Sequence, residues 1–526
     1  MLLRSRGSLF SSLLLTTGAA ALGVAAGCGG ELQPNAVRAA IITRTDDVDC
    51  PPGIPCDEVP AAYAVTDAKT GAYGNYDLAD RDRDGQAIRY IVIHTTEGSY
   101  AGTLAVFQDP KYSASAHYVI RSRDGHLAKM VSPDHLAWHA GNWYFNMHSV
   151  GIEHEAASPD GHSWFTDELY ATSAALVRHL AARYHIPLDR EHIIGHDEVP
   201  GLSQARTPAM HWDPGPYWDW DRFMRMVRPD GGAAPGDRRD DGTAPVGPVR
   251  ILPDYASNLP TVSYCFGAGG TDCRAAAPQS SNFLYLRSAP RASAPLLVNR
   301  YLATTPADRM YNWGNKAGSG RLYYRIETSG DWDAIYFGGQ AAWFYNPGHR
   351  STRIPLLRAD QAVITPRAGS GSIAVYGGGY PGDAAYKPPT TPQRLEKVYD
   401  LPEGQLYIAQ GPITADYYWA KVWAATLPMA SHKVVADSTS YYVVSFNHRL
   451  ALVRAEDVTL VRTTRGPGGG PDRLRFEPAA VAPGASSPPP AADSPDEPPA
   501  GEAAPGETAP GETAGEMQPR DLRGLQ

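Results

Sequence analysis

Between residues 88 and 227 the sequence alternates short apolar runs with a helical pattern, and this alternation constrains the fold more than any other feature. Three runs are rich in β-branched and aromatic residues and are predicted to be strands: residues 89–93, 117–120 and 149–153. A helix is predicted over 166–184, because Thr166 can cap its first turn and its apolar residues recur on one face. This mixture predicts an α/β fold class, with a central mixed β-sheet flanked by helices.

The chain is long enough for several folded units, since 526 residues exceed what one hydrophobic core normally supports. We expect the α/β domain to cover residues 86–228, an N-terminal extension to precede it over 29–85, and a linker rich in Gly, Pro, Asp and Arg to follow it over 229–249. The acidic run at 80–84 resembles part of a calcium-binding loop. Because Ile91 stands where such a loop needs a bidentate Glu, we predict a solvated turn instead.

The second half of the chain is predicted to be mainly β. Its apolar residues form short β-type runs separated by turn residues, which we divide into one region over 250–350 and a second β-rich region over 351–465. The last stretch, 466–526, consists mostly of Pro, Ala, Gly and Glu and cannot bury enough apolar surface to fold. We therefore expect a disordered tail.

The N-terminus, residues 1–28, has the pattern of an export signal. Arginines near its start precede an apolar stretch and a group of small residues that ends at Cys28. Two interpretations fit this group: ordinary signal cleavage after Ala26, or a lipobox in which Cys28 is acylated, although Ala25 stands where lipoboxes usually carry Leu. Both predict an exported protein in the extracellular space, the cell wall or the periplasm. No later stretch approaches the roughly 20 apolar residues of a membrane span, so a lipid on Cys28 would be the only membrane anchor.

Charge and cysteine usage exclude some classes of function. The net charge of −9 argues against a nucleic acid partner. Four cysteines lie in two close pairs, Cys50 with Cys56 and Cys265 with Cys273, which predicts two local disulfides in an oxidising compartment. The alternative, a zinc site made by the four cysteines, would require Cys-x-x-Cys spacing, and the pairs do not have it.

Three residues that can ligate a metal ion follow apolar runs or a turn in the α/β domain. His94 ends Ile-Val-Ile-His, His196 follows Ile-Ile-Gly, and Asp213 stands in His-Trp-Asp-Pro. Two imidazoles and a carboxylate can bind Zn²⁺ and leave its fourth position open to water. A single histidine at a strand end is more often structural than a ligand, so the prediction depends on the set of three.

These phrases resemble, in the same order, those of the zinc-dependent N-acetylmuramoyl-L-alanine amidases, the family that includes T7 lysozyme and the animal peptidoglycan recognition proteins. The resemblance covers about residues 86–228 and includes Ser-Ala-His-Tyr at 115–118, Ala-Trp-His-Ala-Gly at 137–141 and Ser-Val-Gly-Ile-Glu at 149–153. It implies zinc-dependent hydrolysis of the amide bond between N-acetylmuramic acid and L-alanine in bacterial peptidoglycan. The expected partners are therefore peptidoglycan or muropeptides.

The resemblance also implies roles for individual residues. His94, His196 and Asp213 match the zinc ligands, and Glu153 matches the carboxylate that serves as the catalytic base. His211 stands where many relatives have a Lys that stabilises the oxyanion. It is either a catalytic group of that kind or a structural residue, and as a histidine its charge would depend on pH.

Three further residues fall in phrases that line the substrate groove of similar proteins: Trp138, His139 and Asn146. For Trp138, packing in the core is an equally good interpretation. The interval between His196 and Asp213 is longer than in the family, and residues 203–209 look inserted. We expect this inserted loop to reshape one wall of the cleft.

Other functions are less well supported by the sequence. The absence of a Gly-x-Ser-x-Gly elbow and of a His-Glu-x-x-His motif argues against serine hydrolases and zincin proteases. The main alternative is a non-catalytic protein that recognises peptidoglycan with the same groove. Tyr-Leu-Arg-Ser-Ala-Pro at 285–290 and Gly-Asp-Trp-Asp at 330–333 resemble bacterial SH3-type repeats, so we expect an SH3-like β domain that binds cell wall. The aromatic residues of this region also fit the core of a small barrel.

Overall fold

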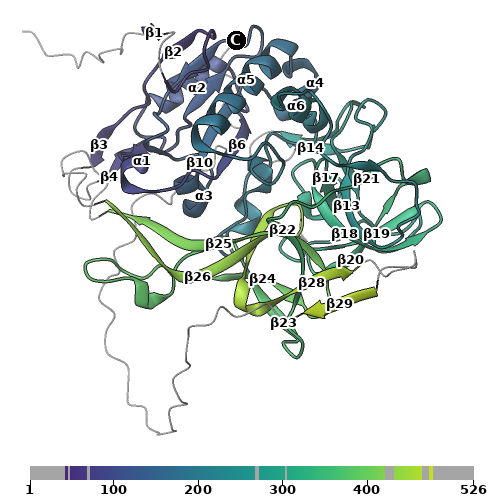
Figure 1. Cartoon of the computed structure of the whole chain (residues 1–526). Coiled ribbons are helices and arrows are strands. Elements are labelled where there is room, and N and C mark those ends of the chain that lie inside the picture. The colour runs from purple at the N-terminus through teal and green to yellow at the C-terminus, as the bar shows by residue number, and fades with distance from the viewer. Residues whose placement is uncertain are drawn as a thin grey trace, which may run out of the picture. The chain divides into compact units, whose positions relative to one another are not determined.

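The computed structural model describes residues 42–44, 48–67, 72–266, 272–302, 305–420, 432–464 and 473–477. The predicted export signal with Cys28, and nearly all of the predicted tail, lie outside these residues. In the described ranges, no helix is both long and apolar enough to span a bilayer. Figure 1 shows the elements named below.

An α/β domain is built around one mixed sheet. Among the described residues, seven strands form it in the order β1–β2–β8–β7–β10–β6–β11. Their bounds, in this order, are Ile42–Arg44, Cys56–Glu58, Leu127–Lys129, Tyr118–Ile120, Ser149–His154, Tyr90–Thr95 and Ile193–Gly195. β10 is parallel to both β6 and β7, while β7 and β8 are antiparallel. The three strands predicted from the sequence are β6, β7 and β10, and the predicted mixed sheet is confirmed.

Helices pack against this sheet. Their bounds are α1 Arg81–Asp84, α2 Tyr100–Phe107, α3 Trp143–His148, α4 Gly161–Trp164, α5 Asp167–Tyr184 and α6 Trp220–Val227. α5 is the predicted long helix, and the Thr166 side chain caps it by accepting a hydrogen bond from the Leu169 backbone N–H at 3.2 Å. α5 and α6 cover one face of the sheet, where alternate strand residues point. That core includes Ile91, Ile93, Val150, Ile152, Leu176, Leu180 and Phe223.

The described residues of the predicted N-terminal extension, 29–85, add strands to the α/β domain, which the prediction did not include. β1 and β2 extend the mixed sheet, where β2 runs parallel to β8. Two small antiparallel pairs follow: β3 (Ala64–Asp67) with β4 (Ala72–Gly74), and β5 (Tyr76–Asp77) with β9 (Leu136–Ala137). Strands of two to four residues are too short to show a period in the sequence, so their pairing could not be predicted.

The acidic run at 80–84 is also not a solvated turn. It contains the short helix α1, which Asp80 caps, and Arg81 within it is buried. The Arg81 guanidinium donates hydrogen bonds to the backbone carbonyls of Pro133 and Ser149, each at 2.8 Å. A buried cation needs such partners, and these contacts attach the segment to the start of β10.

A six-stranded sheet follows the α/β domain. Among the described residues its order is β12–β21–β13–β18–β19–β20, with bounds Arg238–Arg239, Thr352–Ile354, Gly247–Ile251, Leu322–Ser329, Trp332–Phe337 and Gln340–Tyr345. Two strand pairs accompany it, β14 (Ser263–Phe266) with β15 (Asp272–Ala275) and β16 (Phe283–Tyr285) with β17 (Lys316–Gly318). The predicted linker over 229–249 is shorter in the structure, because β12 and the first residues of β13 belong to this sheet. β21 likewise lies beyond the predicted boundary at 350.

Both predicted disulfides are formed. Cys50 is bonded to Cys56, and Cys265 is bonded to Cys273 across the β14–β15 pair. The four thiols are therefore not available for the alternative zinc site.

An eight-stranded sheet completes the described chain. Its order is β24–β23–β27–β26–β25–β22–β28–β29 among the described residues. The bounds, in this order, are Lys397–Pro402, Ser372–Tyr376, Leu450–Arg454, Lys433–Ser445, Tyr407–Trp419, Gln361–Pro366, Val458–Thr464 and Arg473–Glu477. β29 lies inside the predicted disordered tail and pairs with β28, so that prediction is wrong for 473–477.

The eight-stranded sheet shares a core with the α/β domain, and the described residues between 42 and 477 belong to one compact unit. The shared cluster joins the sheet face opposite α5 to α3 and to strands β25, β26 and β27; it includes Tyr90, Val92, Ile194, Tyr144, Phe145, Tyr417, Tyr441 and Leu452. At its edge the Asp416 carboxylate accepts a hydrogen bond from Arg89 at 2.7 Å and lies 2.8 Å from Nε2 of His148. One face of the α/β sheet is therefore buried by the C-terminal half.

His148 should make the stability of this contact depend on pH. Burial and the Arg89 charge lower the pKa of His148 below its usual 6.5, although Asp416 opposes this. The unfolded chain then binds the proton more readily, so stability is fully present above pH 6.5 and is lost as the pH falls from 6.5 toward the folded pKa. We expect His148→Gln to reduce the acid-induced loss by up to about 1.4 kcal/mol per pH unit. Denaturant titrations at pH values on either side of 6.5 measure the free energy of unfolding of both proteins. If this free energy fell equally steeply with decreasing pH in the variant and in the wild type, the prediction would be contradicted.

Candidate active site

Parallel pairing of β6 and β10 brings two of the predicted residues together. His94 on β6 and Glu153 on β10 are direct partners in the register of the two strands. Partners in a parallel ladder point to the same face of the sheet, so the imidazole and the carboxylate are neighbours. Both stand near the carboxyl ends of their strands, the edge at which open α/β sheets bind ligands.

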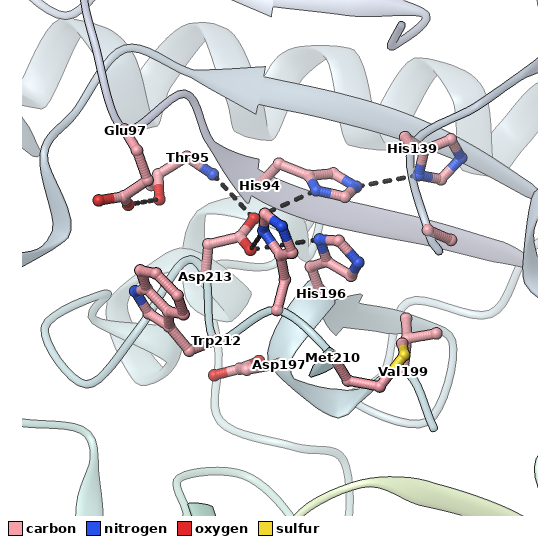
Figure 2. Close-up of polar contacts among 12 residues, drawn as sticks. His94, Thr95, Glu97, His139, His196, Asp197, Val199, Met210, Trp212 and Asp213 are labelled. Atoms are coloured by element: carbon pink, nitrogen blue, oxygen red, sulfur yellow. Dashed lines mark hydrogen bonds and ion pairs between the residues drawn. The ribbon is translucent and has the colours of Figure 1, made fainter. Parts of the chain in front are cut away.

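Asp213 completes the cluster from a loop. His196 directly follows β11 and starts a short 3-10 turn, His196–Glu198. Oδ2 of Asp213 lies 3.2 Å from Nδ1 of His94, and Oδ1 lies 3.2 Å from Nδ1 of His196. One ligand atom from each of the three residues lies within 4.8 Å of the others. Figure 2 shows the Asp213 carboxylate beside both rings.

The protonation states of this cluster suit a bound cation. Burial alone would raise the pKa of Asp213, but the contacts with His196, His211 and His94 hold it well below its usual range. Burial lowers the pKa of His196 to about 4, although Asp213 opposes this. At neutral pH Asp213 is therefore a carboxylate and His196 a neutral imidazole, which are the forms that ligate metal ions.

Two polar atoms at this position lack protein partners. Within the described part of the chain, Nε2 of the buried His196 makes no hydrogen bond, and Oε2 of Glu153 makes none either. Buried polar groups without partners are rare and indicate a ligand, an ion or ordered water. His94, His196 and Asp213 therefore fit a metal ion in donor type, charge and spacing.

A second group of similar residues does not fit a cation. Asp240, Asp333 and His349 also offer atoms within 4.8 Å of one another. The guanidinium of Arg325 lies among them, 2.6 Å from Asp240 and 3.1 Å from Asp333. Because this buried arginine already compensates both carboxylates, a metal ion there would face a fixed positive charge.

Two carboxyl groups beside the cluster have raised pKa values. Burial, reinforced by the charges of Asp213 and Glu97, raises the pKa of Glu153 well above its usual range. Burial also raises the pKa of Glu97 to about 7, against the hydrogen bonds that its carboxylate accepts from Ser158 and Thr95. The sequence analysis missed Glu97. The phrase His-Thr-Thr-Glu, which starts at His94, is the signal that could have identified it.

His211 lies at the exposed side of the cluster. Its Nδ1 is 3.3 Å from Oδ1 of Asp213, and its ring stacks on that of His196 at a centroid distance of 4.9 Å. Burial would lower the pKa of His211, but the hydrogen bond with Asp213 and the charge of that carboxylate raise it. Since 47% of the side-chain surface is exposed, the His211 ring is accessible from solvent.

Known proteins share the sequence around this site. Residues 84–216 match the family model described as N-acetylmuramoyl-L-alanine amidase. N-acetylmuramoyl-L-alanine amidase A of Achromobacter lyticus is 33% identical over 158 residues, which span 27% of this chain and 84% of that protein. The chain belongs to the N-acetylmuramoyl-L-alanine amidase family. The family and the enzyme class predicted from the sequence are thereby confirmed.

Two further known proteins are similar to part of this chain. The 1,6-anhydro-N-acetylmuramyl-L-alanine amidase AmpD of Salmonella typhimurium is 37% identical over 119 residues, 22% of this chain and 57% of that protein. The solved structure of PlyL aligns with 34% of this chain and 98% of its own length, at 17% identity and a TM-score of 0.23. The family model ends at residue 216, so both large β-sheets of the second half lie outside it.

The amidase domain places two of the predicted groove residues behind the cluster. His139 is buried, and its Nδ1 lies 2.9 Å from Nε2 of His94. Asn146 is buried as well, and its side-chain oxygen accepts hydrogen bonds from the backbone N–H groups of His139 and Ala140. His139 therefore contacts His94 directly, as partners of metal-ligating histidines commonly do, and Asn146 holds the backbone at His139. A contact of either residue with substrate stays a prediction.

Two interpretations of Trp138 fit the sequence, as a core residue or as a residue that contacts substrate, and its side chain is partly packed and partly exposed. It is half-buried, its indole N–H donates a hydrogen bond to Asp77 at 2.8 Å, and its ring lies 5.6 Å from that of Tyr73. Part of its surface faces solvent, so a contact with substrate stays a prediction.

The inserted residues 203–209 contact the second half of the chain. Thr207 within them is buried and hydrogen-bonds Tyr399 of β24. Just before the insertion, the backbone of Gly201 approaches that of Gly377 so closely that a Cβ on Gly377 would lie 2.1 Å from the Gly201 carbonyl oxygen. The insertion therefore contacts the eight-stranded sheet. The prediction that it reshapes one wall of the cleft did not include this contact.

Proposed function

We propose that this amidase is zinc-dependent and that it hydrolyses the bond between N-acetylmuramic acid and L-alanine in peptidoglycan. His94, His196 and Asp213 would hold the ion. The observation that supports this most is the convergence of their three donor atoms within 4.8 Å, beside Glu153. A bound Zn²⁺ would lower the pKa of a water molecule to about 7 and polarise the scissile carbonyl.

Glu153 is the proposed general base. Its carboxylate shares a sheet face with His94, and its buried Oε2 has no hydrogen-bond partner among the described residues. It can therefore accept a proton from the attacking water and pass it to the departing L-alanine nitrogen. Burial raises the pKa of Glu153, and this favours delivery of the proton to the departing nitrogen.

His211 is the proposed oxyanion donor. Its contact with Asp213 raises its pKa, which favours the protonated form, and its ring reaches the exposed side of the site. A protonated imidazole there stabilises negative charge as it develops on the carbonyl oxygen. Asp213 thus has two functions in this proposal, as a ligand and as the partner that favours the protonated form of His211.

We place the reaction outside the cytoplasm. The export pattern of residues 1–28 and two disulfides support this, because disulfides persist in oxidising compartments. A lipid anchor at Cys28 and an SH3-like wall-binding region within 250–350 belong to the same proposal. Together they would hold the enzyme near peptidoglycan or muropeptides.

Chelation and zinc restoration test the cofactor. Purified peptidoglycan is incubated with the protein as isolated, after chelator treatment, and after zinc is added back, and the release of peptides with a free L-alanine terminus is measured. We expect activity to disappear with the chelator and to return with zinc. If a zinc-loaded protein binds peptidoglycan but releases no peptide, the catalytic proposal fails and the non-catalytic recognition function takes its place.

A further inference from the structure

The segment that connects His196 to Asp213 is held by donors from outside the amidase domain. It carries a proposed metal ligand at each end, and Figure 2 labels His196, Val199, Met210 and Asp213 along it. Loops and 3-10 turns leave backbone carbonyls without partners in their own segment, and buried carbonyls need donors. The residues that supply these donors therefore help to fix the positions of the two proposed ligands.

Arg449, between β26 and β27, supplies most of them. Its Nη1 donates to the carbonyl oxygen of Val199 at 2.6 Å and lies 3.5 Å from that of His196. Its Nη2 donates to the carbonyl oxygens of Met210 at 3.2 Å and His211 at 2.9 Å. The segment has two arms: residues 196–199 next to the ligand His196, and residues 210–213 next to the ligand Asp213. One planar guanidinium therefore bridges both arms.

Burial makes Arg449 hard to replace. Only 8% of its surface is exposed, and the carboxylates of Asp197, Asp213 and Glu198 lie near enough to stabilise its charge. Without the guanidinium, these carboxylates would lose a cation and the carbonyls would lose their donors in a water-poor environment. Unpaired buried groups of this kind are strongly unfavourable, so the segment would rearrange.

Other residues of the second half hold the same segment. The indole N–H of Trp313 donates to the carbonyl oxygen of Trp212 at 3.3 Å. The His448 ring stacks on Trp313 at a centroid distance of 3.8 Å, and its Nε2 lies 3.3 Å from Oδ2 of Asp197. The loop is therefore fixed at several positions, and Arg449 is the contact that reaches both of its arms.

We propose that Arg449 is a positioning residue of the metal site: its guanidinium sets the separation of the two arms and thereby the spacing of His196 and Asp213. The inference rests on the proposed zinc site. It gives the eight-stranded sheet a part in building the active site, while the proposed binding of cell wall belongs to the region within 250–350. Because 238 residues separate His211 from Arg449, no local sequence pattern could indicate this contact.

The test measures metal affinity of the full-length chain carrying Arg449→Met. Zn²⁺ is titrated in competition with a chromophoric chelator, and Co²⁺ is substituted so that its visible spectrum reports ligand geometry. We expect zinc affinity to fall by about 10- to 100-fold and the Co²⁺ spectrum to change. Asp416→Asn is the matched control, because it breaks a buried contact of the same sheet with Arg89 and His148, away from the ligands. It should lower the Tm and leave zinc affinity unchanged.

A second variant, Arg449→Lys, covers the case in which Arg449→Met does not fold. Lysine keeps the charge but offers one nitrogen in place of a planar fork, so zinc affinity should fall by a smaller factor than in Arg449→Met. Wild-type affinity in the lysine variant, or an equal loss in Asp416→Asn, would overturn the positioning role and leave the proposed function intact. A wild-type chain that binds no Zn²⁺ would overturn both.

Discussion

The Glu153→Gln variant should release stem peptides from peptidoglycan about 10²- to 10⁴-fold more slowly than the wild type, the range that a positioned general base contributes. Glutamine keeps the shape of the side chain but cannot accept the proton of the attacking water. Since Glu153 is not a proposed ligand, the variant should bind zinc as tightly as the wild type. A variant that keeps its rate would exclude Glu153 as the base.

The same substitution should not cost stability. Burial raises the pKa of Glu153 above the usual 4.5, so the folded state favours the protonated form and loses stability as the pH rises above 4.5. Glutamine removes that unfavourable charge and leaves no hydrogen bond of Oε2 broken. The metal-free variant should therefore melt at or above the Tm of the metal-free wild type at neutral pH.

Glu155→Gln is the control for this experiment. The Glu155 carboxylate accepts hydrogen bonds from the backbone N–H groups of Tyr100 and Ser122, each at 2.8 Å, just beyond the end of β10. Its replacement should lower the Tm, because an amide offers only one acceptor atom, and should change the rate little. Equal losses of rate in Glu153→Gln and Glu155→Gln would indicate a general effect of perturbing β10 rather than the removal of a base.

The sequence could predict the core of the site because its residues lie at the ends of recognisable apolar strands. His94 and Glu153 become neighbours through the register of two such strands, and His196 directly follows a third. The roles of His139 and Asn146 could not be predicted in the same way. Their motif identifies the segment, but only the fold shows that His139 contacts His94 and that Asn146 holds the backbone at His139.

Contacts between distant segments are what the sequence could not predict. Strands β1, β2 and β12 have two or three residues each, too few to distinguish a strand from a linker by hydrophobic alternation. Nothing in the sequence distinguishes Arg449 from a surface arginine, because its role depends on carbonyl oxygens that lie some 240 residues earlier in the chain. The sequence predicts a catalytic domain over 86–228 and a wall-binding region within 250–350. It does not predict that the loop carrying the proposed ligands is held by residues of the second half.

Asp213→Asn should lower zinc affinity by more than about 100-fold, beyond the loss caused by removing a residue that only supports a ligand. The Asp213 carboxylate contacts Nδ1 of His94, His196 and His211, and it accepts a hydrogen bond from the Thr95 backbone N–H at 3.3 Å. Asparagine has nearly the same shape, but it lacks the negative charge that offsets a dication. Its NH₂ group would also replace one of the two acceptor oxygens. Peptide release should fall together with zinc content.

Asp333→Asn is the matched control for this loss, because the buried Asp333 lies in the second group of three possible metal ligands, which has two acids and a histidine. Arg325 already supplies the positive charge in that group, so the variant should keep one zinc ion per chain as measured by elemental analysis. If Asp333→Asn lost the metal and Asp213→Asn kept it, the ion would belong to the second group. The convergence of His94, His196 and Asp213 would then need an explanation other than metal binding, and Glu153 would have no activated water to deprotonate.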